Sequence, residues 1–102
     1  MCAGCVARGG QNRPMLELFP ETALVEDGAL SVGGLGAAGL ADEFGTPLVV
    51  FCERTIRSRV QAYRAAAPDD ALVVYGTKAF PNVALLRLLA EDGIGADVST
   101  LG

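Results

Sequence analysis

The sequence predicts an α/β fold with parallel strands. From residue 48 onward the chain reads as strand, helix, strand, helix and strand, and the predicted strands are short apolar runs rich in valine. Strands that alternate with helices become parallel neighbours, and apolar runs without alternation are typical of strands covered on both faces. Of the 102 residues 51% are hydrophobic, which is enough for one small core if the fold is complete.

Composition excludes several classes of protein. The net charge is -4 and no basic run is present, whereas nucleic-acid phosphates require clustered positive charge. No apolar run approaches the roughly 20 residues of a membrane span. The first ten residues lack the charged start and apolar stretch of a secretory signal, so we expect a cytoplasmic protein. The chain has no histidine, which excludes Ser-His-Asp and Cys-His catalysis within it.

Residues 1–17 are expected to form a flexible extension, because the run up to Pro14 is polar and rich in glycine and other small residues. Cys2 and Cys5 form a CxxC, which is half of a zinc site, a redox pair, or incidental. A structural zinc requires four ligands and Cys52 is the one cysteine left, so the incidental interpretation is favoured and no metal is expected. Cys52 itself lies in an apolar run and is predicted to be a small buried hydrophobe.

Three elements are predicted before the middle of the chain. An Asp-Gly turn signal precedes a short strand over residues 29–34. A short helix over residues 37–44 ends at Gly45, because the Thr-Pro pair that follows favours extended backbone. Residues 48–52, with the sequence LVVFC, are predicted to be a strand buried on both faces.

The clearest helix signal covers residues 54–67. Its apolar face comprises Ile56, Val60, Tyr63 and Ala67, and its other face carries Arg57, Gln61 and Arg64. Arginines at positions 54, 57, 59 and 64 make a phosphate-binding patch one alternative. A solvated outer face of the helix is the favoured interpretation.

The last third of the chain is predicted as strand, helix and strand. Residues 71–76 form a second buried strand after a Pro-Asp-Asp turn. Asn82 is the expected N-cap of an apolar helix that stops at Gly93. Residues 93–99 then follow as a third strand.

A first candidate site is the segment 34–39, which reads GLGAAG and matches GxGxxG. It follows a predicted strand, opens a helix, and has Glu53 located 19 residues after Gly34. Such glycines let a pyrophosphate approach a helix N-terminus, and the acid would bind a ribose, so a dinucleotide site is one hypothesis. The unit is short, however, because strand, helix and strand take 24 residues against about 30 in the usual motif.

The second candidate is Lys78, the only lysine in the sequence. It follows the predicted strand 71–76, on the loop into the next helix, where α/β barrels place their reacting groups. A primary amine forms a Schiff base with an aldehyde, whereas a guanidinium stays protonated and does not. A single exposed lysine is usually a solvated surface charge, so position alone leaves both interpretations open.

The residues around Lys78 resemble one enzyme family. The segments FPETA, DGALSVGG, LADEFGTPLVVF, VVYGTKAFPN and LLAEDGIGADVSTLG occur in the order and spacing of diaminopimelate decarboxylases, which are pyridoxal-phosphate enzymes with an alanine-racemase-like barrel. The resemblance covers about residues 18–102. Its most specific element is Tyr-Gly-Thr-Lys-Ala-Phe, where the family pattern is close to Y-A-x-K-A-N.

The resemblance implies roles for individual residues and a larger fold. Lys78 would hold pyridoxal 5'-phosphate as an internal aldimine and later exchange protons with the substrate, and Asp97 would lie near this lysine to orient its amine or hold a charge. The family fold is a (β/α)8 barrel of about 250 residues with a β-rich second domain. Residues 18–46 would belong to or lead from that second domain, and residues 47–102 would begin the barrel.

The implied reaction is the decarboxylation of meso-2,6-diaminopimelate to L-lysine, the last step of lysine biosynthesis, in a homodimer. The resemblance covers a small part of the barrel, so we expect an N-terminal fragment that is inactive alone and poorly soluble, because strand edges and apolar faces would be uncovered. A soluble monomer with a cooperative unfolding transition would contradict that expectation.

Several alternatives stay open. Ornithine, arginine and carboxynorspermidine decarboxylases and pyridoxal-phosphate racemases share the barrel and the lysine. A dinucleotide-binding domain would instead use residues 34–39. The family's phosphate-binding loop, its pyridinium partner and its substrate-specificity motifs have no counterpart in these 102 residues.

Overall fold

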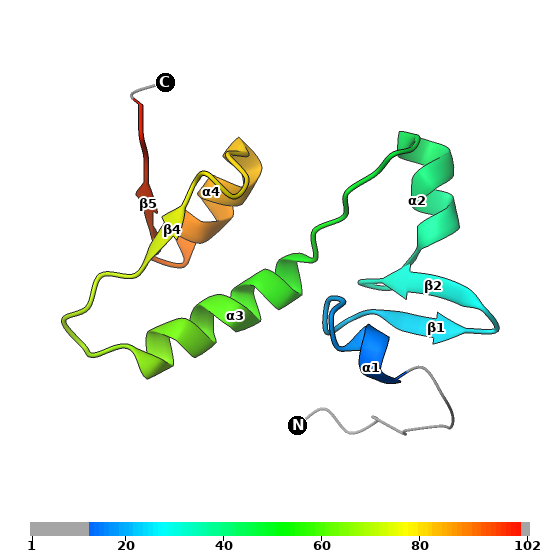
Figure 1. Ribbon diagram of the computed structural model, residues 1–102, viewed down its shortest axis with the longest axis horizontal. Coiled ribbons are helices and arrows are strands. Elements are labelled where there is room, and N and C mark those ends of the chain that lie inside the picture. The colour runs from blue at the N-terminus through cyan, green and yellow to red at the C-terminus, as the bar shows by residue number, and fades with distance from the viewer. Residues whose placement is uncertain (1–12, 101–102) are drawn as a thin grey trace. The chain divides into compact units, whose positions relative to one another are not determined.

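The computed structural model describes residues 13–100, which are drawn in colour in Figure 1. The chain divides after Cys52 into two compact units. Helices and strands occur in both units, so the predicted α/β class is confirmed. Cys2 and Cys5 lie outside the described residues. In the part of the chain that the structure describes, no helix is both long and apolar enough to cross a membrane.

The first unit combines two helices with a small antiparallel sheet. Its helices are α1 (Arg13–Leu16) and α2 (Ala37–Phe44), and its strands are β1 (Leu24–Glu26), β2 (Ala29–Val32) and β3 (Leu35–Gly36). The strands pair in the order β1-β2-β3, and both pairs are antiparallel. Helix α2 has the predicted bounds and ends at Gly45, whose N–H donates to the carbonyl of Ala41. Helix α1 falls within the stretch that was expected to be a flexible extension.

Both hairpins of this sheet turn within two residues. Asp27 and Gly28 connect β1 to β2 with φ angles of 50° and 77°, and Gly33 and Gly34 connect β2 to β3 with 62° and 83°. A positive φ at both turn positions matches the right-handed twist of the flanking strands, and glycine adopts it without a steric penalty. Strand β1 was not predicted, although an Asp-Gly pair between two apolar runs is a strong hairpin signal.

The prediction of a strand buried on both faces over residues 48–52 is wrong. These residues are irregular, and their four large apolar side chains are exposed, namely Leu48, Val49, Val50 and Phe51. A strand requires a neighbour for its backbone hydrogen bonds, and none of the described strands pairs with this run. Cys52 is half-buried rather than buried, and its Sγ lies 3.0 Å from Oγ1 of Thr22 in a hydrogen bond.

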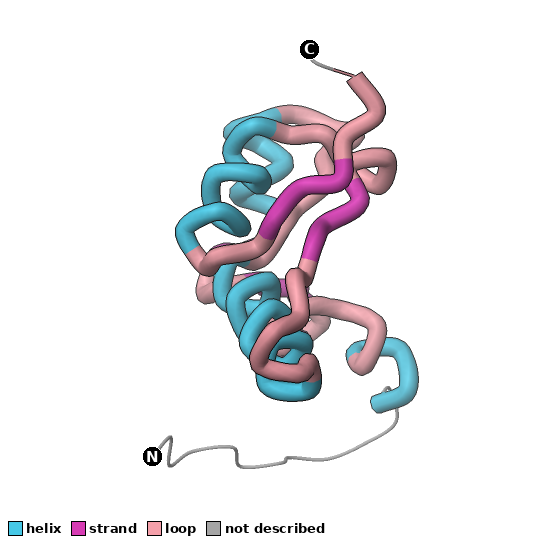
Figure 2. Tube along the Cα trace, turned by 90° about the vertical axis from the view of Figure 1, so that its left-hand side faces the viewer, coloured by secondary structure: helices cyan, strands magenta, loops and turns pink. Residues whose placement is uncertain are grey.

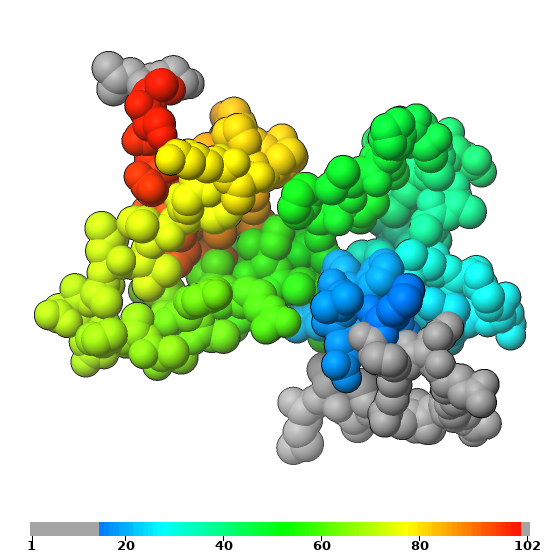
Figure 3. Space-filling model, in the orientation of Figure 1, coloured from blue at the N-terminus to red at the C-terminus, as the bar shows by residue number. Residues whose placement is uncertain are grey.

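The second unit is a parallel βαβ motif with one further helix. Its elements are α3 (Glu53–Ala66), β4 (Val74–Gly76), α4 (Val83–Glu91) and β5 (Gly95–Asp97). Strands β4 and β5 pair in parallel, with Val74 opposite Gly95 and Gly76 opposite Asp97. The two strands run side by side in Figure 2, and the space-filling view shows the C-terminal residues next to those of β4 (Figure 3). The predicted parallel pairing is thereby confirmed.

A small apolar core forms where the two helices of this unit meet the strands. Val60 of α3, Leu89 of α4 and Ile94 before β5 are each less than one tenth exposed. Four partly buried side chains pack against these three, namely Ile56, Val73, Tyr75 and Leu85. The apolar face predicted for α3 is therefore confirmed at two positions, Ile56 and Val60. Tyr63 of the same predicted face is 69% exposed, so that prediction is wrong.

Helix α4 begins and ends as the sequence predicts. The side chain of Asn82 accepts hydrogen bonds from the N–H groups of Ala84 and Leu85, which is the action of an N-cap. At the other end, the N–H of Ile94 donates to the carbonyl of Leu89 at 2.9 Å, and Gly93 has a φ of 74°. These are features of a Schellman motif, which also brings the apolar side chains of residues 89 and 94 together.

Strand β4 is shorter and less buried than predicted. It begins at Val74 instead of residue 71, and Leu72 and Val74 are 78% and 48% exposed. In the described residues β4 has one strand neighbour, β5, and one face of this pair carries the core. A strand with a single neighbour and a single covered face cannot be buried on both faces.

Candidate functional site

The two parallel strands of the second unit end at the same edge. Gly76 is the last residue of β4 and Asp97 the last residue of β5, and the two are register partners. Carboxyl ends of parallel strands are where α/β proteins assemble their sites, because the loops that follow converge there. This edge therefore contains the positions of Lys78 and Asp97, the residues singled out from the sequence.

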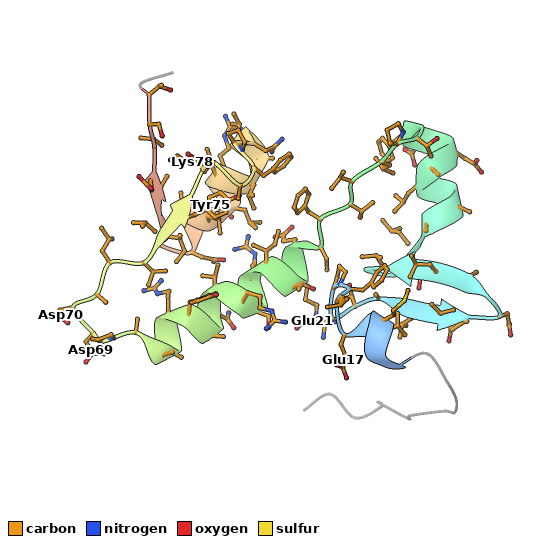
Figure 4. All side chains as sticks on the ribbon, in the orientation of Figure 1. Glu17, Glu21, Asp69, Asp70, Tyr75 and Lys78 are labelled. Carbon is orange, nitrogen blue, oxygen red and sulfur yellow. The ribbon has the colours of Figure 1, made fainter. Side chains whose placement is uncertain are left out.

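Lys78 lies in a tight turn directly after β4. The N–H of Ala79 donates to the carbonyl of Gly76 at 3.1 Å, which places Lys78 third in a four-residue turn. The side chain is exposed, and Figure 4 shows it on the segment between β4 and α4. Within residues 13–100 no hydrogen bond or ion pair engages its amine. None of the described residues therefore occupies this amine.

Asp97 is joined to the lysine turn through its backbone. Its carbonyl oxygen accepts two hydrogen bonds from Thr77, one from the N–H at 3.3 Å and one from the hydroxyl at 2.7 Å. The Asp97 side chain is exposed and takes no hydrogen bond or ion pair from the described residues. The structure therefore places a lysine and a carboxylate on adjoining strand ends, with Thr77 as the link between the two backbones.

Tyr75 holds the other side of the same loop. Its ring packs against the core of the second unit, and its hydroxyl donates to the carbonyl of Phe80 at 3.3 Å. Neither Tyr75 nor Thr77 was assigned a role in the sequence. The signal that was available is their place beside Lys78 in the Tyr-Gly-Thr-Lys core.

Two of the four arginines of α3, Arg57 and Arg64, are already engaged within the second unit, which disfavours the alternative phosphate site. The guanidinium of Arg57 binds the carboxylates of Glu91, Glu53 and Asp92 at 2.9, 2.9 and 2.7 Å. These hydrogen bonds, that to Glu91 foremost, raise the pKa of Arg57 well above its usual value. Arg64 donates to the backbone carbonyl of Asp92 at 2.6 Å. Both side chains connect α3 to the end of α4. Arg57 is only partly exposed, so the expectation of a solvated outer face is wrong there, whereas Arg64 is exposed as expected.

The GxGxxG segment does not have the context of a dinucleotide site. Gly34 lies in the β2–β3 hairpin turn, and Gly36 is the last residue of β3 and the N-cap of α2. A dinucleotide fingerprint requires a parallel strand-helix-strand unit. Here the strands are antiparallel and residues 48–52 form no strand. The glycines provide the turn and the helix start instead.

No cluster of metal ligands occurs in the described range. Residues 13–100 contain no group of three or more Cys, Asp or Glu side chains arranged to hold a metal ion. Cys52, the cysteine of this range, is engaged with Thr22. The candidate site is accordingly defined by Lys78 and its surroundings.

A parallel βαβ motif is typical of α/β proteins, a class in which sites form at the carboxyl ends of the strands. No protein-family model matches the chain. Curated relatives do match it. The chain is 41% identical over 96 residues to the diaminopimelate decarboxylase of Actinosynnema pretiosum, covering 92% of this chain and 22% of that protein.

The diaminopimelate decarboxylase of Aquifex aeolicus is 46% identical over 76 residues, which cover 74% of this chain and 18% of that protein. The chain belongs to the diaminopimelate decarboxylase family. It spans about a fifth of the length of the curated relatives it matches.

Solved structures agree with this assignment. A crystal structure of an Aquifex aeolicus protein matches with a TM-score of 0.76 and 42% identity, over 82% of this chain and 21% of that one. Diaminopimelate decarboxylase from M. jannaschii, crystallised in complex with L-lysine, matches with a TM-score of 0.70 and 35% identity, over 79% of this chain and 20% of that one. The fold of the described residues is therefore shared with this family.

Proposed function

We propose that this chain contributes the cofactor-binding lysine of an enzyme that decarboxylates meso-2,6-diaminopimelate to L-lysine with pyridoxal 5'-phosphate. The observation that carries the proposal is an uncommitted primary amine at the carboxyl edge of a parallel strand pair, in a chain similar to diaminopimelate decarboxylases over most of its length. The full protein would be a cytoplasmic homodimer. Residues 47–102 would begin its (β/α)8 barrel, and residues 18–46 would belong to or lead from a β-rich domain.

The residues present fit an aldehyde cofactor. Lys78 offers a primary amine that no described side chain occupies, and its turn projects beyond the ends of two strands. A guanidinium at this position would remain protonated and could not attack an aldehyde carbon. Asp97, on the adjoining strand end, supplies a carboxylate at the same edge.

When bound, the cofactor's ring accepts the electrons left behind as the carboxyl group departs. Lys78 Nζ must first lose its proton, because only the neutral amine has the lone pair that attacks an aldehyde. When it is not bound to the cofactor, the same nitrogen would be able to hold a proton or deliver it to carbon. Asp97, on the adjoining strand end, would orient the amine or hold a charge beside it.

The first test removes the amine. Lys78→Ala and Lys78→Arg are compared with the wild type in the full-length protein, after incubation with pyridoxal 5'-phosphate and reduction with borohydride. We expect peptide mass mapping to find the reduced adduct on Lys78 in the wild type. In Lys78→Ala and Lys78→Arg, the peptide that contains position 78 should carry no adduct. Formation of L-lysine from meso-2,6-diaminopimelate should fall to background in both.

Lys78→Arg is the matched control because it retains the positive charge without the primary amine. An arginine variant with normal turnover would show that charge alone is needed and would refute the proposed role. Normal turnover by Lys78→Ala would refute it equally.

A further inference from the structure

The turn that carries Lys78 is held on both sides by side-chain hydroxyl groups. Before the lysine, Thr77 donates hydrogen bonds to the carbonyl oxygen of Asp97, the last residue of β5. After the lysine, the carbonyl oxygen of Phe80 accepts a hydrogen bond from the hydroxyl of Tyr75. Between them, the Ala79 N–H closes the turn onto β4. A short exposed loop is thus connected to both strands.

The contact made by Thr77 is the shorter of the two. Its hydroxyl lies 2.7 Å from the carbonyl oxygen of Asp97, and its N–H lies 3.3 Å from the same atom. A carbonyl oxygen has two lone pairs and can accept both bonds. Threonine is branched at Cβ, so few χ1 rotamers are available and a bonded hydroxyl also restricts the backbone. The residue directly before Lys78 is therefore locked to the end of β5.

The hydrogen bond made by Tyr75 is longer, but the ring that carries its hydroxyl is held by packing. Its ring packs on the core of the second unit, and its hydroxyl reaches Phe80 at 3.3 Å. Hydrogen bonds between oxygens usually measure about 2.7–2.8 Å, so this bond is the weaker of the two. It nevertheless restrains the residue two positions after Lys78.

We propose that Thr77, and to a smaller extent Tyr75, are positioning residues that restrict the backbone around Lys78. The inference rests on the proposed function, in which Nζ must meet an aldehyde carbon at a defined place. A lysine side chain is long and flexible, so the position of its amine depends on the backbone that carries it. Restricting that backbone in advance lowers the entropy lost when the amine is fixed by a bound group.

The test removes the Thr77 hydroxyl while keeping the shape of the side chain. Thr77→Val and the conservative Thr77→Ser are compared with the wild type in the full-length protein. The first readout is amide hydrogen exchange at Ala79, whose N–H closes the turn. Loss of one such hydrogen bond should accelerate this exchange roughly 2- to 10-fold in Thr77→Val, and serine should restore most of the protection.

The second readout is the reactivity of the amine. Lys78 is the only lysine of these 102 residues. Peptide mass mapping therefore identifies its borohydride-trapped label from pyridoxal 5'-phosphate, which can be compared with the label on the α-amino group in the same sample. We expect the ratio of Lys78 to α-amino labelling to fall in Thr77→Val, by roughly the factor seen in exchange, and to recover in Thr77→Ser.

Tyr75→Phe should change both readouts in the same direction by a smaller factor. Tyr63→Phe is its matched control, because the Tyr63 ring is 69% exposed on α3 and should change neither readout. An effect of Tyr63→Phe equal to that of Tyr75→Phe would overturn the role assigned to Tyr75.

The outcomes separate this inference from the proposed function. Unchanged exchange at Ala79 in Thr77→Val would overturn the inference whatever happens at Lys78. Faster exchange spread equally over the amides of Leu89 and Ile94 would show a general loss of stability and overturn it as well. Absence of label on Lys78 in the wild type would instead refute the proposed function, and the exchange at Ala79 would still decide whether Thr77 restrains the turn.

Discussion

In the first unit of the chain, backbone hydrogen bonds of an antiparallel sheet hold the strands together, whereas in the second unit helix side chains meet a parallel strand pair. The three buried apolar residues of the described range, Val60, Leu89 and Ile94, all belong to the second unit. The first unit depends on two-residue turns instead. Antiparallel neighbours can form from adjacent sequence, but parallel strands need a crossover that packs against them. The comparison teaches that side-chain packing matters most where the candidate site lies.

The largest expected effect is the loss of a core side chain from the second unit. Leu89→Ala removes a leucine that is 6% exposed, and we expect the second unit to lose about 2–5 kcal/mol of stability from the lost transfer energy and the cavity. Leu24→Ala in β1 is the matched control, because Leu24 is 56% exposed and its truncation should cost within about 0.5 kcal/mol. Residue-resolved amide hydrogen exchange measures the stability change of each variant. Similar losses of stability in the two units would contradict the contrast drawn between them.

An intermediate effect should distinguish two glycines with the same backbone conformation. Gly93 has a φ of 74° and Gly34 a φ of 83°, so alanine at either position should cost about 1–2 kcal/mol of conformational strain. At Gly93 an added Cβ would also lie 2.9 Å from Nη1 of Arg64, which binds the Asp92 carbonyl, whereas at Gly34 nothing lies within 4 Å.

Gly93→Ala should therefore be the more destabilising of the two by roughly 1 kcal/mol, the value of one hydrogen bond. Amide hydrogen exchange measures both costs, at the α4–β5 connection for Gly93→Ala and at the β2–β3 hairpin for Gly34→Ala. Equal costs would mean that Arg64 moves aside without loss and that its bond to Asp92 contributes little.

The smallest expected effect concerns the charged contacts between α3 and the end of α4. Arg57→Met removes the guanidinium but keeps a long apolar side chain, and it leaves the carboxylates of Glu53, Glu91 and Asp92 without their common partner. Because these contacts are partly exposed to water, the loss should be smaller than that of Leu89→Ala. Added salt should reduce the difference in stability between Arg57→Met and the wild type, because salt screens the repulsion between the carboxylates.

Arg59→Met is the matched control. Arg59 is exposed on the same helix, so its replacement should not change the free energy of unfolding measurably.

The raised pKa of Arg57 sets the sign of the pH dependence of stability. A group with a raised pKa stabilises the fold fully below its unfolded value and loses this contribution only as the pH rises through its folded value. For an arginine both lie above the working range, so the contribution of Arg57 should persist in alkaline buffer. A loss at mildly alkaline pH would contradict this.

Local signals in the sequence predicted much of the second unit. Asn82 and Gly93 mark the two ends of α4 because capping depends on residue type within a few positions. Lys78 could be singled out for the same reason, since its chemistry and its place after a strand are both visible in the sequence. The hairpin at Asp27 and Gly28 has an equally local signal, because an Asp-Gly pair stands between two apolar runs.

Other features could not be predicted from local signals. Residues 48–52 have the composition of a strand, but composition does not supply a neighbouring backbone to bind. Arg57 looked like a solvated charge, because its partners Glu91 and Asp92 lie 34 and 35 residues further along the chain. The same holds for the bond from Thr77 to Asp97, which joins residues 20 positions apart.

The sequence by itself determined the caps and turns, the family, and a lysine whose amine suits an aldehyde, because each depends on residue types at short spacing. Only the tertiary structure decided what lies around that amine. The parallel pairing of β4 and β5 brings Asp97 to the end of β4, and side chains of α3 and α4 form the apolar core against which Val73 and Tyr75 pack. These relations connect residues distant in sequence, and their geometry follows from packing that no local pattern encodes.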